Sequence, residues 1–298
     1  MTNQNKAYIF ASFAVLFWST APSAFKLTLR YLNTIEMLLY SSFTASLALF
    51  LILIFQKKLN QFKQFSNKDF LHSAILGFLN PFFYYVILFK AYTLLPGQMA
   101  QPLNFVWPLM IVLLSIPILG QKIKPASILA IFISFCGVII ISTKGRFATM
   151  DMVNPLGVFL ALSSSIIWAL FFLINVRDKR DETLKLFLSF TFGFLFVLIV
   201  FLFQAKFPDF IGILGAIYIG LFEMGITFVI WVKALKLSQT TAQVNNLIYL
   251  TPFLALIFLN IFIKEEILFS TIIGLIFIVT GILIQRKVGG KIESNKSS

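Results

Sequence analysis

The sequence predicts an all-α integral membrane protein with ten transmembrane helices in two inverted repeats of five. One observation is composition: of 298 residues, 59% are hydrophobic and only 12% are charged, about half the charged fraction of an ordinary soluble domain. A second is a series of ten long apolar runs, and a third is the return of one half's residue pattern in the other. Runs this long predict helices, because a backbone in hydrocarbon must satisfy its hydrogen bonds within its own segment.

Ten runs of about 17 to 25 residues are long enough to cross a bilayer as helices. In the first half they are Ala7–Phe25, Ile35–Phe55, Leu71–Phe89, Gln98–Leu119 and Ser127–Ser142. In the second half they are Pro155–Asn175, Leu184–Phe203, Ile211–Val232, Thr241–Ile263 and Phe269–Gln285. Helix-breaking residues between 143 and 155 separate the halves, so we predict one repeat over residues 1–144, another over 155–287 and a polar tail over 288–298.

The two halves share positions at a period close to half the chain. Pro108 lies 144 residues before Pro252, and Lys90 lies 143 residues before Lys233. Because each repeat has an odd number of helices, the second copy enters the membrane from the opposite side. Such inverted repeats are typical of secondary transporters, which bind their substrates between the two copies.

The basic residues predict an orientation in the membrane. With the N-terminus in the cytoplasm, 16 Lys and Arg fall on the cytoplasmic side and 5 on the other, leaving Lys26, Lys90 and Lys233 at or within span ends. We therefore expect both termini in the cytoplasm and the protein in an inner or plasma membrane. The first run resembles a secretion signal, but Trp18 in it has a counterpart in Trp168, 150 residues later. We expect it to be kept as a helix.

The segment Leu103-Asn104-Phe105-Val106-Trp107-Pro108-Leu109 resembles the Asn-Tyr-Leu-Trp-Pro signature of YddG-like aromatic amino acid exporters. These belong to the EamA family of the drug/metabolite transporter superfamily, whose members have ten spans in two repeats, and the resemblance covers essentially the whole chain. Phe105 stands where the subgroup often has Tyr, and Gln121 stands where the repeats commonly have Glu. The resemblance implies a carrier that exports amino acids or related small amphipathic metabolites, with aromatic amino acids favoured.

Glu223 is the acidic residue that lies deep within a predicted span. A charge at the bilayer centre costs roughly 2.5 to 3.5 kcal/mol on insertion scales, so its presence needs a reason. Thr227 shares its helical face, and the 143-residue offset places Asn80 at the equivalent point of the third span, with Tyr84 on that face. Glu223 is therefore a candidate for a substrate-ammonium contact or a protonatable gate. The alternative is a structural bond to a neighbouring helix, for example to Asn80 or a Lys.

The fourth and ninth spans carry the densest uncharged polar groups. Amides in hydrocarbon need partners from neighbouring helices, water or a ligand, and proline bends a helix at a depth where transporter sites are often found. These faces are candidates for the cavity wall, and bonds between helices are the alternative. The residues are Gln101, Asn104 and Pro108 in the fourth span and Asn245, Asn246, Tyr249 and Pro252 in the ninth.

Aromatic side chains are candidates for a lining that suits an amphipathic amino acid. They are Trp18, Tyr84, Trp107 and Trp168. With 37 Phe in the chain, packing or anchoring at the membrane surface is the alternative for each. Lys26 shares a helical face with Trp18 and either points into the cavity toward a carboxylate or extends to the lipid headgroups.

The sequence offers no catalytic constellation. We expect the sole histidine, His72, to have no Cys or Asp partner, and the sole cysteine, Cys136, to pack within its apolar run. We therefore predict that the protein is not an enzyme and has no cofactor and no metal site. The net charge of +13 is spread in short clusters between spans, so we expect no nucleic-acid partner.

The expected partners are the lipid bilayer and a small-molecule substrate. Gly137, Gly274 and Gly281 suit close helix packing, within the bundle or in a homodimer. A passive channel or facilitator, an exporter of drugs or other metabolites, and a lipid-handling or assembly protein remain the alternative functions. A carrier saturates and exchanges its substrate, whereas a channel conducts without exchange.

Overall fold

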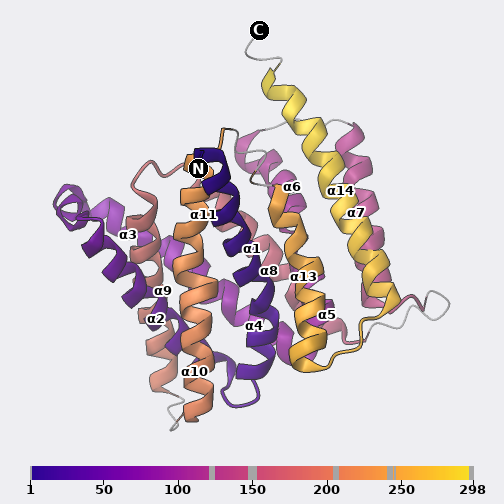
Figure 1. Cartoon of the computed structure of the whole chain (residues 1–298), viewed down its shortest axis with the longest axis horizontal. Coiled ribbons are helices and arrows are strands. Elements are labelled where there is room, and N and C mark those ends of the chain that lie inside the picture. Colours follow the sequence, from indigo (N-terminus) through magenta and orange to yellow (C-terminus); the bar gives the residue numbers. More distant parts are fainter. Residues whose placement is uncertain are drawn as a thin grey trace.

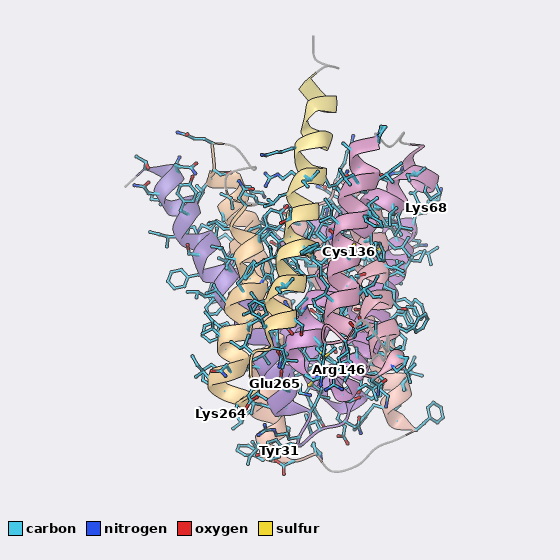
Figure 2. The ribbon with its side chains drawn as sticks, turned by 90° about the vertical axis from the view of Figure 1, so that its right-hand side faces the viewer. Tyr31, Lys68, Cys136, Arg146, Lys264 and Glu265 are labelled. Carbon is cyan, nitrogen blue, oxygen red and sulfur yellow. The ribbon has the colours of Figure 1, made fainter. Side chains whose placement is uncertain are left out.

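The computed structural model describes residues 2–120, 125–146, 153–203, 208–239, 244 and 246–294. Within these ranges the chain is helical and forms no β-strand, and ten helical spans are long and apolar enough to cross a membrane. Helix α1 starts, and helix α14 ends, at the same end of the bundle (Figure 1). We call this the terminal end and the opposite one the far end. Lys68 lies toward the terminal end, and Tyr31, Lys264 and Glu265 lie toward the far end (Figure 2).

The spans of the first half follow the predicted order. They are α1 (Asn3–Thr28), α2 (Thr34–Phe55), α3 (Asn67–Gly77) with η2 (Phe78–Phe83) and α4 (Tyr84–Leu94), α5 (Gly97–Asn104) with α6 (Trp107–Leu119), and α7 (Pro125–Ser142). A short 3-10 helix, η1 (Leu59–Gln64), joins α2 to α3. Polar caps set several starts: Asn33 and Glu36 form a capping box on α2, and Ser66 and Asp69 form one on α3.

The spans of the second half repeat this series. They are α8 (Pro155–Asn175), α9 (Glu182–Leu202), α10 (Phe210–Ile219) with η3 (Gly220–Gly225) and α11 (Ile226–Leu237), η4 (Asn246–Leu250) with α13 (Thr251–Phe258) and η5 (Leu259–Ile263), and α14 (Phe269–Ser294). The side chains of Asn154, Asp181 and Asp209 cap α8, α9 and α10. Helix α14 runs past residue 287, into the segment predicted as a polar tail.

The third and eighth spans share an irregularity that hydropathy does not predict. Both spans have 28 residues, Asn67–Leu94 and Phe210–Leu237, and both are interrupted midway by a π-helical segment, η2 and η3. Within η2, Asn80 leaves helical geometry with φ −147° and ψ 119°. Such π segments are frequent at functional sites, and these two recur at equivalent points of the repeats.

The two repeats pack against each other reciprocally. A Cβ added to Gly77 of α3 would lie 2.5 Å from the Ser189 carbonyl oxygen of α9, and one added to Gly220 would lie 2.5 Å from the Ser41 carbonyl oxygen of α2. The third span of each repeat therefore lies against the second span of the other repeat. This exchange is the arrangement expected of two inverted repeats related by a pseudo-two-fold axis.

Helices α7 and α14 form a close pair at one edge of the bundle (Figure 1). A Cβ on Gly137 would lie 2.4 Å from the Gly274 carbonyl oxygen, and Ser134 Oγ donates a hydrogen bond to the Ile278 carbonyl oxygen at 3.1 Å. These small residues let the two backbones approach. The glycines thus serve packing within the bundle, and the homodimer stays a prediction.

Both prolines predicted to bend a helix stand where a new helical segment begins. The fourth span breaks at Phe105 and Val106, and Pro108 occupies the first turn of α6. In the ninth span, Pro252 occupies the first turn of α13, after the 3-10 helix η4. Proline suits this position because its missing N–H would have no helical partner there.

Candidate functional site

A cavity of about 710 Å³ lies between the two repeats, within the range of small-molecule sites. The predicted residues that line it are Trp18, Tyr84, Gln101, Asn104, Trp107, Trp168 and Glu223. They come from α1, α4, α5 and α6 of one repeat and from α8 and η3 of the other. The structure therefore brings together seven of the predicted site residues around one space.

Glu223 is held in this cavity by contacts with the opposite repeat. Its side-chain oxygen Oε1 accepts a hydrogen bond from the Tyr85 hydroxyl at 3.0 Å, and its backbone carbonyl accepts one from Trp18 Nε1 at 3.3 Å. The expected structural partners, Asn80 or a Lys, were wrong. Tyr85, which is 1% exposed, lies one residue beyond the predicted Tyr84 and was not itself predicted from the sequence.

Asn80 is buried but does not line the cavity. Neither atom of its side-chain amide has a hydrogen-bond partner among the described residues. The repeat offset placed it correctly, in the π-helical segment equivalent to that of Glu223. The π segment changes the direction of the side chains that follow, so the predicted common face of Asn80 and Tyr84 is lost.

Aromatic rings form a continuous wall around the carboxylate. The Trp18 ring lies 5.4 Å from those of Phe228 and Trp231, and the Trp168 ring lies 6.0 Å from Phe228 and 5.1 Å from Tyr84, measured between centroids. Trp231 could have been found, because it lies on the helical face of Glu223. Phe228 carries no signal that separates it from the other phenylalanines.

The side-chain amides of the fourth span form hydrogen bonds with neighbouring helices, which was the alternative interpretation of these residues. Asn104 Nδ2 donates to Ser164 Oγ at 2.8 Å, and its Oδ1 accepts from the Tyr84 hydroxyl at 3.3 Å. Gln101 Oε1 accepts from the Tyr92 hydroxyl at 2.9 Å. These bonds fix two amides at the cavity wall, where both also line the open space.

The remaining predicted site residues lie elsewhere. Thr227 is buried and donates to the Phe222 carbonyl oxygen at 2.5 Å, a carbonyl in the π segment. Asn246 is exposed and bonds to Arg286. Tyr249 packs on Phe105, with ring centroids 6.5 Å apart. None of the three lines the cavity, and Asn245 and Gln121 lie outside the described residues.

Lys26 joins two elements at the far end instead of lining the cavity. Its Nζ donates to the carbonyl oxygens of Tyr92 at 3.0 Å and Leu95 at 3.1 Å, at the C-terminal end of α4. The C-terminal carbonyls of a helix lack helical donors and carry partial negative charge, so they suit an ammonium group. Neither expected role, a cavity carboxylate partner or a headgroup contact, describes this position.

A second set of contacts ties α5 to the loop before α14 at the same end. The Glu265 carboxylate accepts from the backbone N–H groups of Gly97 at 2.9 Å and Gln98 at 3.0 Å. The Gln98 side chain in turn donates to the Glu266 carbonyl oxygen at 2.5 Å and accepts from the Leu268 N–H at 2.9 Å. A carboxylate at a helix N-terminus is favourable. The far end is therefore bound across the repeats.

At the terminal end the cavity reaches the chain segments that follow α8 and end α11. Its lining there includes Asn175, Val176, Glu182 and Lys236. Val176 is 63% exposed, and Lys236 is also exposed. The cavity is thus open toward the terminal end and closed toward the far end.

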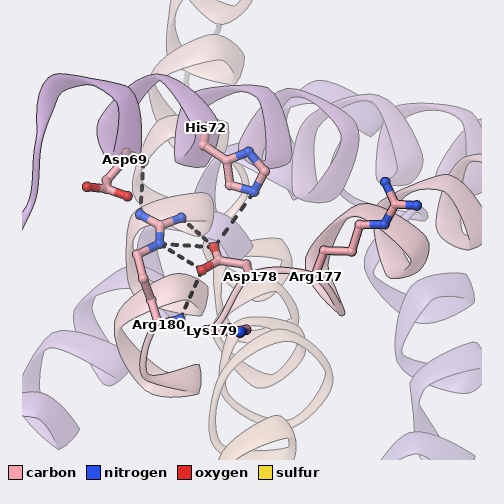
Figure 3. Close-up of a pocket in the computed structure, with 6 residues that line it drawn as sticks. All are labelled: Asp69, His72, Arg177, Asp178, Lys179 and Arg180. Carbon is pink, nitrogen blue, oxygen red and sulfur yellow. Dashed lines mark hydrogen bonds and ion pairs between the residues drawn. The ribbon is translucent and has the colours of Figure 1, made fainter.

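A second hollow, of about 470 Å³, lies at the terminal end beside the loop between α8 and α9 (Figure 3). Asp178 stands in its wall, contacted by Arg180 Nε at 3.0 Å and Nη2 at 2.5 Å and by His72 Nε2 at 3.7 Å. The expectation that His72 has no Asp partner was wrong, because its partner is distant in sequence. Burial would raise the pKa of Asp178, but hydrogen bonds and charge from Arg180 outweigh it and hold the pKa below its usual range.

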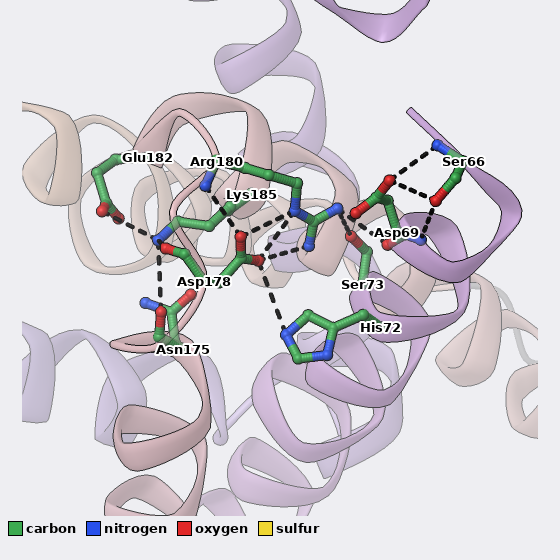
Figure 4. A network of polar contacts seen from close by, with 9 residues as sticks. All are labelled: Ser66, Asp69, His72, Ser73, Asn175, Asp178, Arg180, Glu182 and Lys185. Atoms are coloured by element: carbon green, nitrogen blue, oxygen red, sulfur yellow. Dashed lines mark hydrogen bonds and ion pairs between the residues drawn. The ribbon is translucent and has the colours of Figure 1, made fainter. Parts of the chain in front are cut away.

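This cluster anchors the loop that borders the cavity (Figure 4). Arg180 Nη1 also donates to the Asp69 carbonyl oxygen at 2.9 Å and to Ser73 Oγ at 3.0 Å on α3. Lys185, only 2% exposed, donates to the Asp178 carbonyl oxygen at 2.9 Å and the Glu182 carboxylate at 3.0 Å. The two basic residues therefore fix the start of α9, where Glu182 lines the cavity mouth.

Comparison with known proteins agrees with this architecture. A protein from Clostridium kluyveri named as an uncharacterized transporter is 29% identical over 182 residues, 56% of each chain. One from Archaeoglobus fulgidus with the same name is 23% identical over 93% of this chain and 96% of its own. Protein PecM of Dickeya dadantii is 22% identical over 72% of this chain and 73% of its own. For the Clostridium protein, the aligned region covers little more than half of its length.

A solved crystal structure shows the same fold, with a TM-score of 0.65 and 20% identity over 97% of this chain and 99% of the other. The model of the EamA-like transporter family matches residues 5–143 and again residues 155–285. Each match covers one five-helix half of the bundle described above. The chain is a multi-pass membrane protein and belongs to the EamA-like transporter family.

Proposed function

We propose that this protein is a secondary carrier that exports amino acids or related small amphipathic metabolites, with aromatic ones favoured, by alternating access. The observation that carries the proposal is the cavity between the repeats, which has aromatic walls and one carboxylate, Glu223, at their centre. Aromatic walls favour an aromatic body, and the carboxylate favours an ammonium group. The likeness of the segment 103–109 to YddG-like exporters supports the same substrates.

In the proposed orientation, the cavity is open to the side from which an exporter takes up its substrate. Lys and Arg are concentrated in the loops of the terminal end, which supports a cytoplasmic terminal end in an inner or plasma membrane. The open cavity then faces the cytoplasm and loads substrate there. The contacts of Lys26 and Glu265 close the opposite side, and their release accompanies outward opening.

Counterflow in proteoliposomes tests the carrier. The purified protein is reconstituted, the vesicles are loaded with one unlabelled amino acid, amine or cationic drug at a time, and uptake of the labelled solute is followed. A carrier gives saturable uptake that the internal solute accelerates. Uptake that rises linearly with concentration and ignores the internal solute would instead indicate a channel, and absence of exchange with every solute contradicts the carrier. Exchange confined to cationic drugs would favour the drug-exporter alternative.

A further inference from the structure

The charges around the cavity are unevenly placed. Among the described lining residues the carboxylates are Glu223 and Glu182, and the only cation is Lys236. Glu182 and Lys236 stand at the terminal end, where Glu182 accepts from Lys185 and Lys236 is exposed. The inner part of the described lining therefore holds a carboxylate and no cation. Lys26, which was a candidate from the sequence for pointing into the cavity, does not line it.

Three hydrogen-bond donors near Glu223 are already in use. The Tyr84 hydroxyl donates to Asn104, the Tyr85 hydroxyl to Glu223 itself, and Trp18 Nε1 to the Glu223 carbonyl oxygen. The Glu223 oxygen Oε2, in contrast, accepts no hydrogen bond from the described residues, so a ligand can donate to it. This part of the cavity offers an acceptor and lacks free charged donors.

The neutral polar groups that remain suit an uncharged part of a ligand. Thr251 lies in the lining, and its hydroxyl Oγ1 is buried and has no partner among the described residues. A hydroxyl or ring N–H on an aromatic body can pair with such a group. A carboxylate would gain a hydrogen bond there but no opposite charge, and burying a charge without one is strongly unfavourable.

An aromatic amine fits these conditions better than an aromatic amino acid. A primary aliphatic amine is cationic at neutral pH, because its pKa is close to that of Lys, about 10.4. Its ammonium group can meet Glu223 and the ring faces of Trp18 and Trp231, which lie 5.4 Å apart by centroid. The zwitterion of the same aromatic body brings in addition a carboxylate toward Glu223, with like-charge repulsion as the result.

We propose that the cavity is selective for aromatic monoamines, cations with an aromatic body and no carboxylate, over the amino acids of the same body. This inference rests on the proposed carrier function and narrows its substrate class: the aromatic preference remains, and the carboxylate is excluded.

Three probes that share a phenyl ring and differ in charge test the selectivity. They are phenethylamine, phenylalanine and 3-phenylpropionate, used as competitors and as internal solutes in the counterflow assay. We expect phenethylamine to half-saturate exchange at a concentration about 30-fold or more below that of phenylalanine, the factor for an unpaired buried charge. We expect 3-phenylpropionate not to compete. If phenylalanine half-saturates exchange at a concentration equal to or below that of phenethylamine, the selectivity proposal is overturned and the carrier function still stands.

A charge-removing variant and a matched control locate the effect. Glu223→Gln keeps the shape of the side chain. It should raise the half-saturating concentration of phenethylamine about 30-fold or more and that of phenylalanine much less. Glu266→Gln removes an exposed carboxylate at the far end, whose side chain does not line the cavity, and should leave both unchanged. Equal losses for both probes in Glu223→Gln would contradict the charge argument.

Binding in detergent separates this inference from the carrier function. A ligand that binds only the folded protein raises its melting temperature, and the rise grows with the ratio of ligand concentration to dissociation constant. If no solute exchanges in vesicles but phenethylamine still stabilises the wild type and not Glu223→Gln, the carrier fails and the amine site stands. If phenethylamine stabilises neither protein, the amine site is refuted.

Discussion

At the scale of single residues, two carboxylates, Glu223 and Asp178, are held in different ways. Glu223 receives one side-chain hydrogen bond, from Tyr85, and faces open space. Asp178 is surrounded by donors, with Arg180 contacting both of its oxygens. The first carboxylate keeps an oxygen for a ligand, whereas the second is committed to holding the α8–α9 loop.

Asp178 makes the stability of this loop depend on pH. Its pKa is lower in the folded protein than in the unfolded chain, so its stabilising contribution is complete above the unfolded value, about 3.9, and disappears as pH falls through the lower folded value. We expect Asp178→Asn to melt at a lower temperature than the wild type at pH 7 and to lose less stability on acidification. Melting curves in detergent from pH 7 to pH 3 measure both; a parallel acid decline in the two proteins would argue against this role.

The contacts that the sequence did not predict have two physical causes. Tyr84 and Asn80 were placed on one face by helical spacing, but the π segment η2 lies between regular turns and rotates the side chains beyond it. Tyr85 then reaches Glu223. The acceptors of Lys26 are backbone carbonyls, which have no signature in a side-chain pattern. Burial depth and aromatic character could be predicted, and the individual partners could not.

At the scale of helices, close contacts between small residues decide how the spans fit. A Cβ on Gly77 would meet the Ser189 carbonyl oxygen, the Phe192 Cβ and the Gly193 nitrogen at 2.5 to 3.0 Å. These are backbone atoms or atoms next to the backbone, so they cannot move aside as a flexible side chain would. The contact of α3 with α9 thus depends on the absence of a side chain.

Gly77→Ala should therefore separate α3 from α9. Overpacking of this kind typically costs about 1 to 3 kcal/mol, and we expect a lower melting temperature for the purified protein. Ser12→Ala, at an exposed position of α1, is the control and should melt like the wild type. An unchanged melting temperature for Gly77→Ala would mean that the two helices can separate at little cost.

The number and limits of the spans were largely predictable, because hydropathy and length are read directly from the sequence. All ten predicted runs overlap helical spans, and α8 has the predicted bounds Pro155–Asn175, while the start of the ninth run, at 241–243 and 245, lies outside the described residues. The third and eighth spans extend several residues beyond the predicted limits, since polar caps and Lys side chains at their ends lower local hydropathy without ending the helix. The π segments were not predictable, because they depend on hydrogen-bond register.

At the scale of the whole molecule, the two ends of the cavity differ in the contacts between helices. At the far end, Lys26 and Glu265 bind backbone groups of α4 and α5. The 150-residue offset that relates Trp18 to Trp168 places Val176 at the position of Lys26 in the other repeat. The Val176 side chain cannot donate a hydrogen bond, and Val176 stands exposed at the open end. The asymmetry of the repeats matches the asymmetry of access.

Removing the Lys26 contacts should therefore shift the protein toward opening at the far end. Lys26→Met keeps the length of the side chain and loses both hydrogen bonds. With Cys136 replaced by Ala, a Cys introduced at Ala21, which lines the cavity, reports access from the far side to a membrane-impermeant maleimide. We expect labelling to be several-fold faster in Lys26→Met, since losing hydrogen bonds of a charged group costs about 1.5 to 3 kcal/mol each.

The control for this measurement is Arg30→Met, which removes another positive charge near the same end. The Arg30 side chain forms no hydrogen bond with the described residues. The labelling rate of this variant should match that of the parent protein. Slower labelling in Lys26→Met, or equal acceleration in both variants, would contradict a closing role for the Lys26 contacts.

The reciprocal glycine contacts also constrain how the protein is made. Gly77 of α3 fits against α9, and Gly220 fits against α2, so each half of the chain completes the other. During synthesis α3 enters the membrane long before α9 exists. The surface of α3 that packs against α9 therefore faces lipid until more than 100 further residues have been synthesised. The first half is consequently an assembly intermediate and not a self-sufficient unit, and final docking of the spans belongs to the last stage of biogenesis.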